Sequence, residues 1–144
     1  MAADNGASAV KLQTYSADTL TLPSTNPEFM IDEGLWEGKS LHELYQIAST
    51  PYEWHRPLAE HARSLGIDLF SAPFDEEAVE FLESEIKPEL YKVSSFEVTH
   101  IPLLKKIANT GKPVIMSVGM ASEEGIRTLR DGKSIVEQLR QPFV

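Results

Sequence analysis

The sequence predicts an α/β fold in which about four parallel strands alternate with helices. Short apolar runs recur along the chain, stretches with apolar residues at helical spacing follow them, and glycine, proline or capping residues separate the two patterns. Strands that alternate with helices imply right-handed crossovers and a parallel sheet. Four such units fit half of a (β/α)8 barrel, which usually needs ~250 residues, or a complete four-stranded open α/β domain.

The strands are expected where apolar residues run together or alternate with polar ones. Their expected ranges are 9–15, 67–73, 90–96 and 113–119. In the first strand, Val10 and Leu12 fall on one face while Lys11 and Gln13 fall on the other, which is the period of a pleated strand. The fourth strand is largely apolar, as expected for a strand that is covered on both faces.

Helices are expected in the stretches between these strands. The long loop 16–49 holds a short helical piece near residues 41–46. The next helix should begin in a capping box, with Thr50 as N-cap and Glu53 as its partner. Pro57 lies inside this helix and should separate or kink its first turn.

Capping residues and glycines mark the other helix ends. Gly66 should stop the helix that follows Thr50, and Asp75-Glu-Glu should begin the next one, where acidic residues favour a helix start. Thr99 is expected to cap a helix that ends at Gly111. A last helix should open at Ser122-Glu-Glu.

The composition limits the classes of function. With 144 residues the chain has room for one globular core, and 13 Lys and Arg against 22 Asp and Glu give a net charge of -9, which argues against a nucleic-acid surface. The absence of cysteine excludes a disulfide scaffold and a cysteine nucleophile. We find no signal-peptide pattern and no membrane-length apolar run, so we expect a soluble, cytoplasmic protein without a membrane partner.

Four polar side chains fall on or near the ends of different expected strands and are candidates for a binding site. They are Lys11, Lys92, Ser95 and Ser117. Carboxyl ends of parallel strands meet at one edge, so these groups should converge there. Both lysines interrupt otherwise apolar strands, and a buried ammonium needs an anion or hydrogen-bond partners. The pair therefore favours a phosphate or carboxylate ligand.

Histidine and tryptophan positions are less informative. The four histidines, His42, His55, His61 and His100, lie on helical or loop segments without a convincing metal-ligand pair, so we expect no metal site within this chain. Trp54 is expected to anchor the core, because its helix needs an apolar face.

Four stretches at the expected strand ends resemble, in order and spacing, the successive motifs of the sialic acid (nonulosonic acid) synthase family. They are Val10-Lys-Leu-Gln-Thr-Tyr15, Phe70-Ser-Ala-Pro-Phe-Asp75, Tyr91-Lys-Val-Ser-Ser-Phe-Glu97 and Gly111-Lys-Pro-Val-Ile-Met-Ser-Val-Gly-Met120. The resemblance covers roughly residues 6 to 124. The stretches 34–45 and 50–55 are more similar to the pseudaminic acid synthase branch than to the N-acetylneuraminate branch.

This resemblance implies a partial (β/α)8 TIM barrel, with residues 1–144 forming part of the N-terminal synthase domain. It implies a metal-dependent, aldol-type condensation of phosphoenolpyruvate with a 2,4-diacetamido-2,4,6-trideoxy hexose, releasing phosphate. The alternatives are an N-acetylneuraminate synthase that uses N-acetylmannosamine, and a catalytically inactive anion-binding fragment.

The resemblance also assigns roles to individual residues. Lys11 and Lys92 would hold the phosphate or carboxylate of phosphoenolpyruvate, and Ser95 and Ser117 would donate hydrogen bonds to it. Gln13 and Glu97 would lie near the sugar, with Glu97 as the catalytic residue. Two departures from the family pattern, Ala72 and Val118, put one hydrogen bond to the phosphate region in doubt.

Other parts of the family pattern have no counterpart in these 144 residues. They are the first strand with its acidic residue, the later strands with two histidine ligands, and the C-terminal antifreeze-like domain. The divalent metal, Mn²⁺ or Mg²⁺, is therefore expected to take ligands that are not in this chain. The family further implies a homodimer for the full-length protein. After Ser122 the resemblance fades, and Arg130-Asp-Gly-Lys133 should break the last helix.

Overall fold

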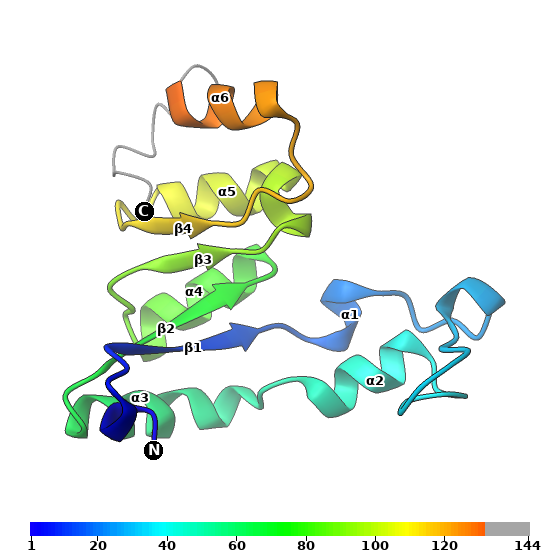
Figure 1. Ribbon diagram of the computed structural model, residues 1–144, viewed down its shortest axis with the longest axis horizontal. Helices are drawn as coiled ribbons and strands as arrows, with labels where there is room; N and C mark the ends of the chain where they lie inside the picture. Colours follow the sequence, from blue (N-terminus) through cyan, green and yellow to red (C-terminus); the bar gives the residue numbers. More distant parts are fainter. Residues whose placement is uncertain (132–144) are drawn as a thin grey trace.

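The computed structural model describes residues 1–131 and contains one four-stranded parallel sheet (Figure 1). Its strands are β1 (Ala9–Thr14), β2 (Asp68–Pro73), β3 (Tyr91–Val93) and β4 (Val114–Met116). The spatial order is β1-β2-β3-β4, so each strand pairs with the next one along the chain. A doubly wound open sheet reverses its strand order at a switch point, whereas a barrel does not. The predicted α/β fold with four parallel strands is confirmed, in the order of a partial barrel.

Helices fill the connections between the strands (Figure 1). They are α1 (Ala17–Leu20), α2 (Leu41–Ala48), α3 (His55–Ser64), α4 (Glu76–Glu85), α5 (Ile101–Ala108) and α6 (Glu123–Asp131). Short 3-10 turns add η1 (Ala3–Asn5), η2 (Pro27–Phe29), η3 (Tyr52–Trp54) and η4 (Phe96–Thr99). Within the described residues, no helix is long and apolar enough to cross a membrane.

The register separates the two faces of the sheet. One row across the four strands consists of Leu12, Ser71, Tyr91 and Val114. Tyr91 and Val114 belong to the core, so this row faces the helices. The next residues along the strands therefore lie on the opposite, inner face, where they form a row of Gln13, Ala72, Lys92 and Ile115.

The hydrophobic core lies between the sheet and the helices α3, α4 and α5. It consists of Ala59, Val79, Leu82, Ile86, Tyr91, Val93, Leu103, Leu104, Ile107 and Val114, with Leu69, Phe81 and Met116 packed against it. The apolar side chains of α4 and α5 recur at helical spacing, which places them on one stripe of each helix. The inner face carries no such layer, and Lys11 and Gln13 are exposed on it.

Two of the predicted helix caps are wrong. Pro51 rather than Thr50 precedes η3, and its side chain makes no capping hydrogen bond. Pro57 is accommodated because the first turn is a separate 3-10 turn, as the alternative of a separate first turn predicted. Thr99 lies inside η4, and the N-cap of α5 is His100, also without a side-chain bond.

The capping box occurs instead at the start of α2. Ser40 Oγ accepts a hydrogen bond from the Glu43 amide, and the Glu43 carboxylate accepts one from the Ser40 amide. This Ser-x-x-Glu pattern before an apolar run was visible in the sequence. The predicted start of α4 is confirmed, because Asp75 Oδ1 accepts a hydrogen bond of 2.6 Å from the Ala78 amide.

Two further expectations need correction, and a third falls partly outside the described residues. The third and fourth strands end earlier than predicted, at Val93 and Met116. After β3 the chain turns because the Glu97 amide donates to the Ser94 carbonyl. Trp54 was expected to anchor the core but is 57 % exposed. The side of α3 that faces the core is formed by His55, Ala59 and Ala62. The expected helix break at 130–133 falls partly outside the described residues, and α6 continues to Asp131.

Candidate functional site

The carboxyl ends of β3 and β4 are joined by a lysine on the inner face. Lys92 Nζ donates hydrogen bonds to the hydroxyl of Ser117 and, at 2.7 Å, to the carbonyl of Val93. Ser117 follows β4 directly, and its amide extends the ladder by donating to the same Val93 carbonyl at 3.0 Å. The half-buried ammonium is thus held in one position at this edge.

A second cation acts on this ammonium. Lys11 of β1 lies exposed on the inner face, which corrects the expectation that both lysines are buried. Burial lowers the pKa of the Lys92 ammonium, the nearby positive charge of Lys11 lowers it further, and the charge of Glu97 acts in the opposite direction. The two lysines therefore share an electrostatic environment, although they belong to non-adjacent strands.

Glu97 lies in the turn after β3 with one buried oxygen. Its Oε2 finds no hydrogen-bond partner among the described residues. Burial raises the pKa of the Glu97 carboxyl, and this effect is partly offset by its own backbone amide, by His100 and by Lys92. A carboxyl with a raised pKa beside an ammonium with a lowered pKa is typical of functional sites, where proton transfer needs such groups.

The loops after β3 and β4 approach each other closely. A Cβ atom added to Gly119 would lie 3.3 Å from Ser95 Oγ, so the half-buried Ser95 hydroxyl sits against backbone that has no side chain. The structure therefore brings Ser95 and Ser117 to the same edge as Lys92 and Glu97. Gln13 is separated from Lys92 by β2, and lies exposed on the inner face beside Ala72.

Sequence reasoning missed a buried polar network on the helix side of the same edge. Thr14 Oγ1 lies 2.8 Å from His55 Nε2 and 2.7 Å from Ser71 Oγ, and all three residues are fully buried. His55 Nδ1 lies 3.2 Å from the carbonyls of Pro51 and Tyr52. Nδ1 must donate to these carbonyls, so in neutral His55 the Nε2 atom accepts from Thr14, and Ser71 donates to Thr14.

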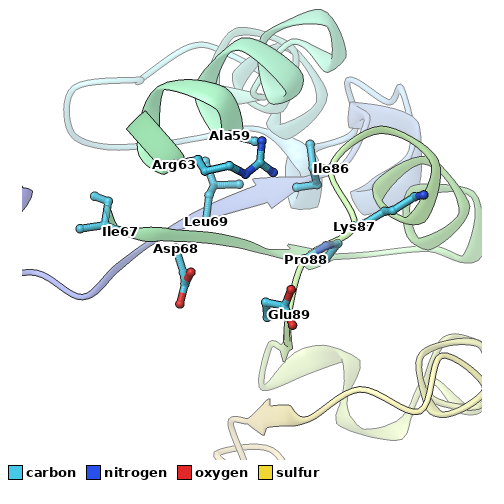
Figure 2. A pocket seen from close by; sticks show the side chains of 9 residues that line it. All are labelled: Ala59, Arg63, Ile67, Asp68, Leu69, Ile86, Lys87, Pro88 and Glu89. Carbon is cyan, nitrogen blue, oxygen red and sulfur yellow. The ribbon is translucent and has the colours of Figure 1, made fainter. Parts of the chain in front are cut away.

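A cavity of about 90 Å³ lies at the opposite, amino-terminal edge of the sheet (Figure 2). It is lined by Ala59, Arg63, Ile67, Asp68, Leu69, Ile86, Lys87, Pro88 and Glu89. None of the predicted site residues lines it. In Figure 2 the Lys87 side chain points away from the other lining groups, and acidic side chains accompany the single guanidinium.

The described residues contain no group of three or more His, Cys, Asp or Glu side chains that could hold a metal ion. The histidines are spread over α2, α3 and the start of α5, and His55 uses both ring nitrogens within the fold. The residues described here therefore do not form a divalent-metal site by themselves.

A family model for the NeuB family matches residues 1–133, which is most of the chain. This chain belongs to the NeuB family. It is 48% identical over 119 residues to a pseudaminic acid synthase of Helicobacter pylori, covering 83% of this chain and 35% of that protein. It is 34% identical over 130 residues to an N,N'-diacetyllegionaminic acid synthase of Legionella pneumophila, covering 90% of this chain and 36% of that protein.

A solved structure supports the fold of this NeuB-family chain. An N-acetylneuraminic acid synthetase of Leptospira borgpetersenii superimposes with a TM-score of 0.77 at 29% identity, covering 99% of this chain and 44% of that one. The chain spans about a third of the length of the two curated synthases, from Helicobacter pylori and Legionella pneumophila. The partial barrel predicted from the motifs is confirmed by this likeness and by the strand order.

Proposed function

We propose that this chain supplies the phosphoenolpyruvate-binding half of the mouth of a NeuB-type synthase. The observation that carries the proposal is that Ser117 holds Lys92 at the carboxyl ends of β3 and β4. Ser95 lies in the adjoining loop against Gly119, and Lys11 on the same face of the sheet is near enough to lower the pKa of Lys92. Two like charges close together favour an anion between them, and hydroxyl donors beside them suit phosphate or carboxylate oxygens.

Phosphoenolpyruvate matches this arrangement because it carries both kinds of anion. In the proposed reaction, C3 of phosphoenolpyruvate forms a carbon–carbon bond to the aldehyde carbon of an open-chain amino sugar, one water is consumed, and phosphate leaves. Lys11 and Lys92 would stabilise the negative charge on the phosphate as it departs. Glu97, whose pKa is raised by burial, would hold or accept a proton beside Lys92.

For the acceptor we propose a 2,4-diacetamido-2,4,6-trideoxy hexose. The support is the 48% identity to pseudaminic acid synthases and the loop stretches 34–45 and 50–55. N-acetylmannosamine is the alternative acceptor, and the likeness to an N-acetylneuraminic acid synthetase supports it. Gln13, exposed on the inner face, is the residue that we assign to the sugar side. We place the reaction in the cytoplasm, in a homodimeric enzyme.

Calorimetry with the 144-residue chain tests the anion site. Phosphoenolpyruvate should bind the wild type, and Lys11→Ala or Lys92→Met should weaken binding at least about tenfold, because each removes a charge-assisted hydrogen bond. Lys105→Ala is the matched control, since Lys105 is exposed on the outer helix α5. Equal affinity in all four proteins would refute the assignment.

The acceptor is tested separately, with an active synthase that carries this sequence. Phosphate release that requires Mn²⁺, phosphoenolpyruvate and the diacetamido hexose supports the proposed acceptor. Release with N-acetylmannosamine but not with the diacetamido hexose would show that the alternative is correct.

A further inference from the structure

The segment between β1 and η3, residues 16–50, is much longer than the connections that follow the other strands. It contains α1, η2 and α2, and it projects beyond the carboxyl ends of the strands (Figure 1). In the described structure no side chain of α2 is fully buried. Ala17 of α1 is buried, but core packing does not fix α2, so contacts between the segment and the edge of the sheet must hold this helix.

One such contact is a hydrogen bond to the turn between β2 and α4. Thr19 Oγ1 donates to Asp75 Oδ2 at 2.7 Å, in a partly buried position. The other oxygen of Asp75 accepts from the Ala78 amide and caps α4. Ser16 Oγ lies 2.9 Å from Thr19 Oγ1, and because Thr19 donates to Asp75, Ser16 donates to Thr19. Asp75 thus joins the segment to a rigid helix start.

An aromatic cluster lies beside this contact. The buried ring of Tyr15 meets the ring of Phe74 edge-on at 5.4 Å and the ring of Tyr45 edge-on at 6.2 Å. Tyr15 follows β1, Phe74 precedes Asp75, and Tyr45 belongs to α2. Burial raises the pKa of the Tyr15 hydroxyl, and Tyr45 raises it further. Helix α1 is therefore attached to this turn directly, through Thr19 and Asp75, whereas α2 is attached to it through Tyr15, which contacts both Tyr45 and Phe74.

The position of this attachment indicates a role. Three of the four residues of the proposed phosphoenolpyruvate site, Lys92, Ser95 and Ser117, belong to β3 or to the loops after β3 and β4. Lys11 contributes to this site from β1, whereas Gln13, two residues nearer the carboxyl end of β1, is the residue assigned to the sugar. Among the described strands, we therefore place the acceptor at the carboxyl ends of β1 and β2. Gln13 faces that side, and the segment begins three residues later at Ser16. Parallel α/β folds bind their ligands with the loops that follow the strands.

We propose that Asp75 is a positioning residue, which holds segment 16–50 through Thr19 on the acceptor side of the mouth, where the segment helps to bind the amino sugar. The acceptor part rests on the proposed function, whereas the attachment rests on the contacts alone. Asp75 itself is a poor target for substitution, since its loss would also uncap α4.

Thr19 offers a cleaner test. Thr19→Val removes the hydrogen bond and keeps the shape of the side chain, and Thr19→Ser is the matched control that keeps the hydroxyl. In the 144-residue chain, hydrogen exchange of the α2 amides should become about tenfold faster in Thr19→Val and return to the wild-type rate in Thr19→Ser. The affinity for phosphoenolpyruvate should be the same in all three proteins. Unchanged exchange in Thr19→Val would overturn the attachment.

The acceptor role has its own measurement. With phosphoenolpyruvate present, the diacetamido hexose at millimolar concentration should slow exchange in α2 of the wild type and of Thr19→Ser, but not of Thr19→Val. If the sugar protects no part of segment 16–50 in the wild type, the acceptor role is wrong. If phosphoenolpyruvate fails to bind while the Thr19→Val effect on α2 persists, the proposed function fails and the attachment stands.

Discussion

The buried His55 should make the stability of this chain depend on pH. Its side chain is fully buried, with Nε2 bonded to Thr14 and the ring against Tyr52 and Phe81 at centroid distances of 5.7 and 5.2 Å. Burial lowers the pKa of His55, and the carbonyls of Pro51 and Tyr52 offset this only in part. The folded state therefore resists protonation of this imidazole more than the unfolded state does.

The sign and size of the change in unfolding free energy with pH follow from the difference in proton binding between the folded and unfolded states. Below pH 6.5 the unfolded chain binds a proton at this histidine that the folded chain does not, so the unfolding free energy falls as the pH falls. Lowering the pH from 6.5 to 5.5 costs at most about 1 kcal/mol from this residue, which is the limit for an imidazole that stays neutral in the folded state. More than about one pH unit above 6.5 both states are neutral and the contribution vanishes.

Urea unfolding followed by circular dichroism at pH 5.5, 6.5 and 7.5 measures this effect. His55→Gln should lose about 1–2 kcal/mol at pH 7.5, because the bonds of the buried ring are only partly replaced. It should also lose less stability than the wild type between pH 6.5 and 5.5. His61→Gln, on the exposed side of the same helix, is the matched control and should keep the wild-type dependence. An identical pH dependence in wild type and His55→Gln would refute the reasoning.

Two further predictions concern the backbone and the activity of the isolated chain. Lys87 closes α4 in the left-handed region, with φ of 48°, and its amide donates to the Leu82 carbonyl at 2.8 Å. Lys87→Gly should therefore raise the unfolding free energy by about 0.5–1 kcal/mol, while Lys87→Ala should not; a gain in both would point to the lost charge instead. The 144-residue chain with Mn²⁺, phosphoenolpyruvate and either sugar should release no phosphate above a metal-only control, because four strands supply only part of a preorganised mouth. Metal-dependent turnover by the purified chain would contradict this.

Local patterns in the sequence determined the order and type of the main elements. Alternation in β1 predicted that Lys11 and Gln13 share a face, and the structure confirms this. Acidic residues after β2 predicted the start of α4 at Asp75. Such features depend on residues that are close in the chain. The spacing of apolar residues and the presence of capping residues are therefore enough to predict them. The motifs at the strand ends also indicated the family, which the comparisons confirm.

Helix caps and the burial of side chains were harder to predict. Both depend on which residues in the folded chain supply hydrogen-bond partners and packing contacts. Thr50 has the residue type of an N-cap, yet the 3-10 turn η3 begins after Pro51. Trp54 is exposed while the polar His55 is buried, since His55 finds Thr14 and two carbonyls as partners. A buried polar group is tolerated when its hydrogen bonds are made, and its partners came from distant parts of the chain.

The sequence by itself determined that lysines and serines stand on or near the ends of parallel strands in an acidic chain that resembles the sialic acid synthase family. Only the tertiary structure decided that Lys92 bonds to Ser117, that one oxygen of Glu97 is buried without a partner, and that Asp75 holds the segment after β1. The physical reason is that these contacts join residues far apart in the chain. Their geometry is set by strand register and by the packing of helices on the sheet, which no local period encodes.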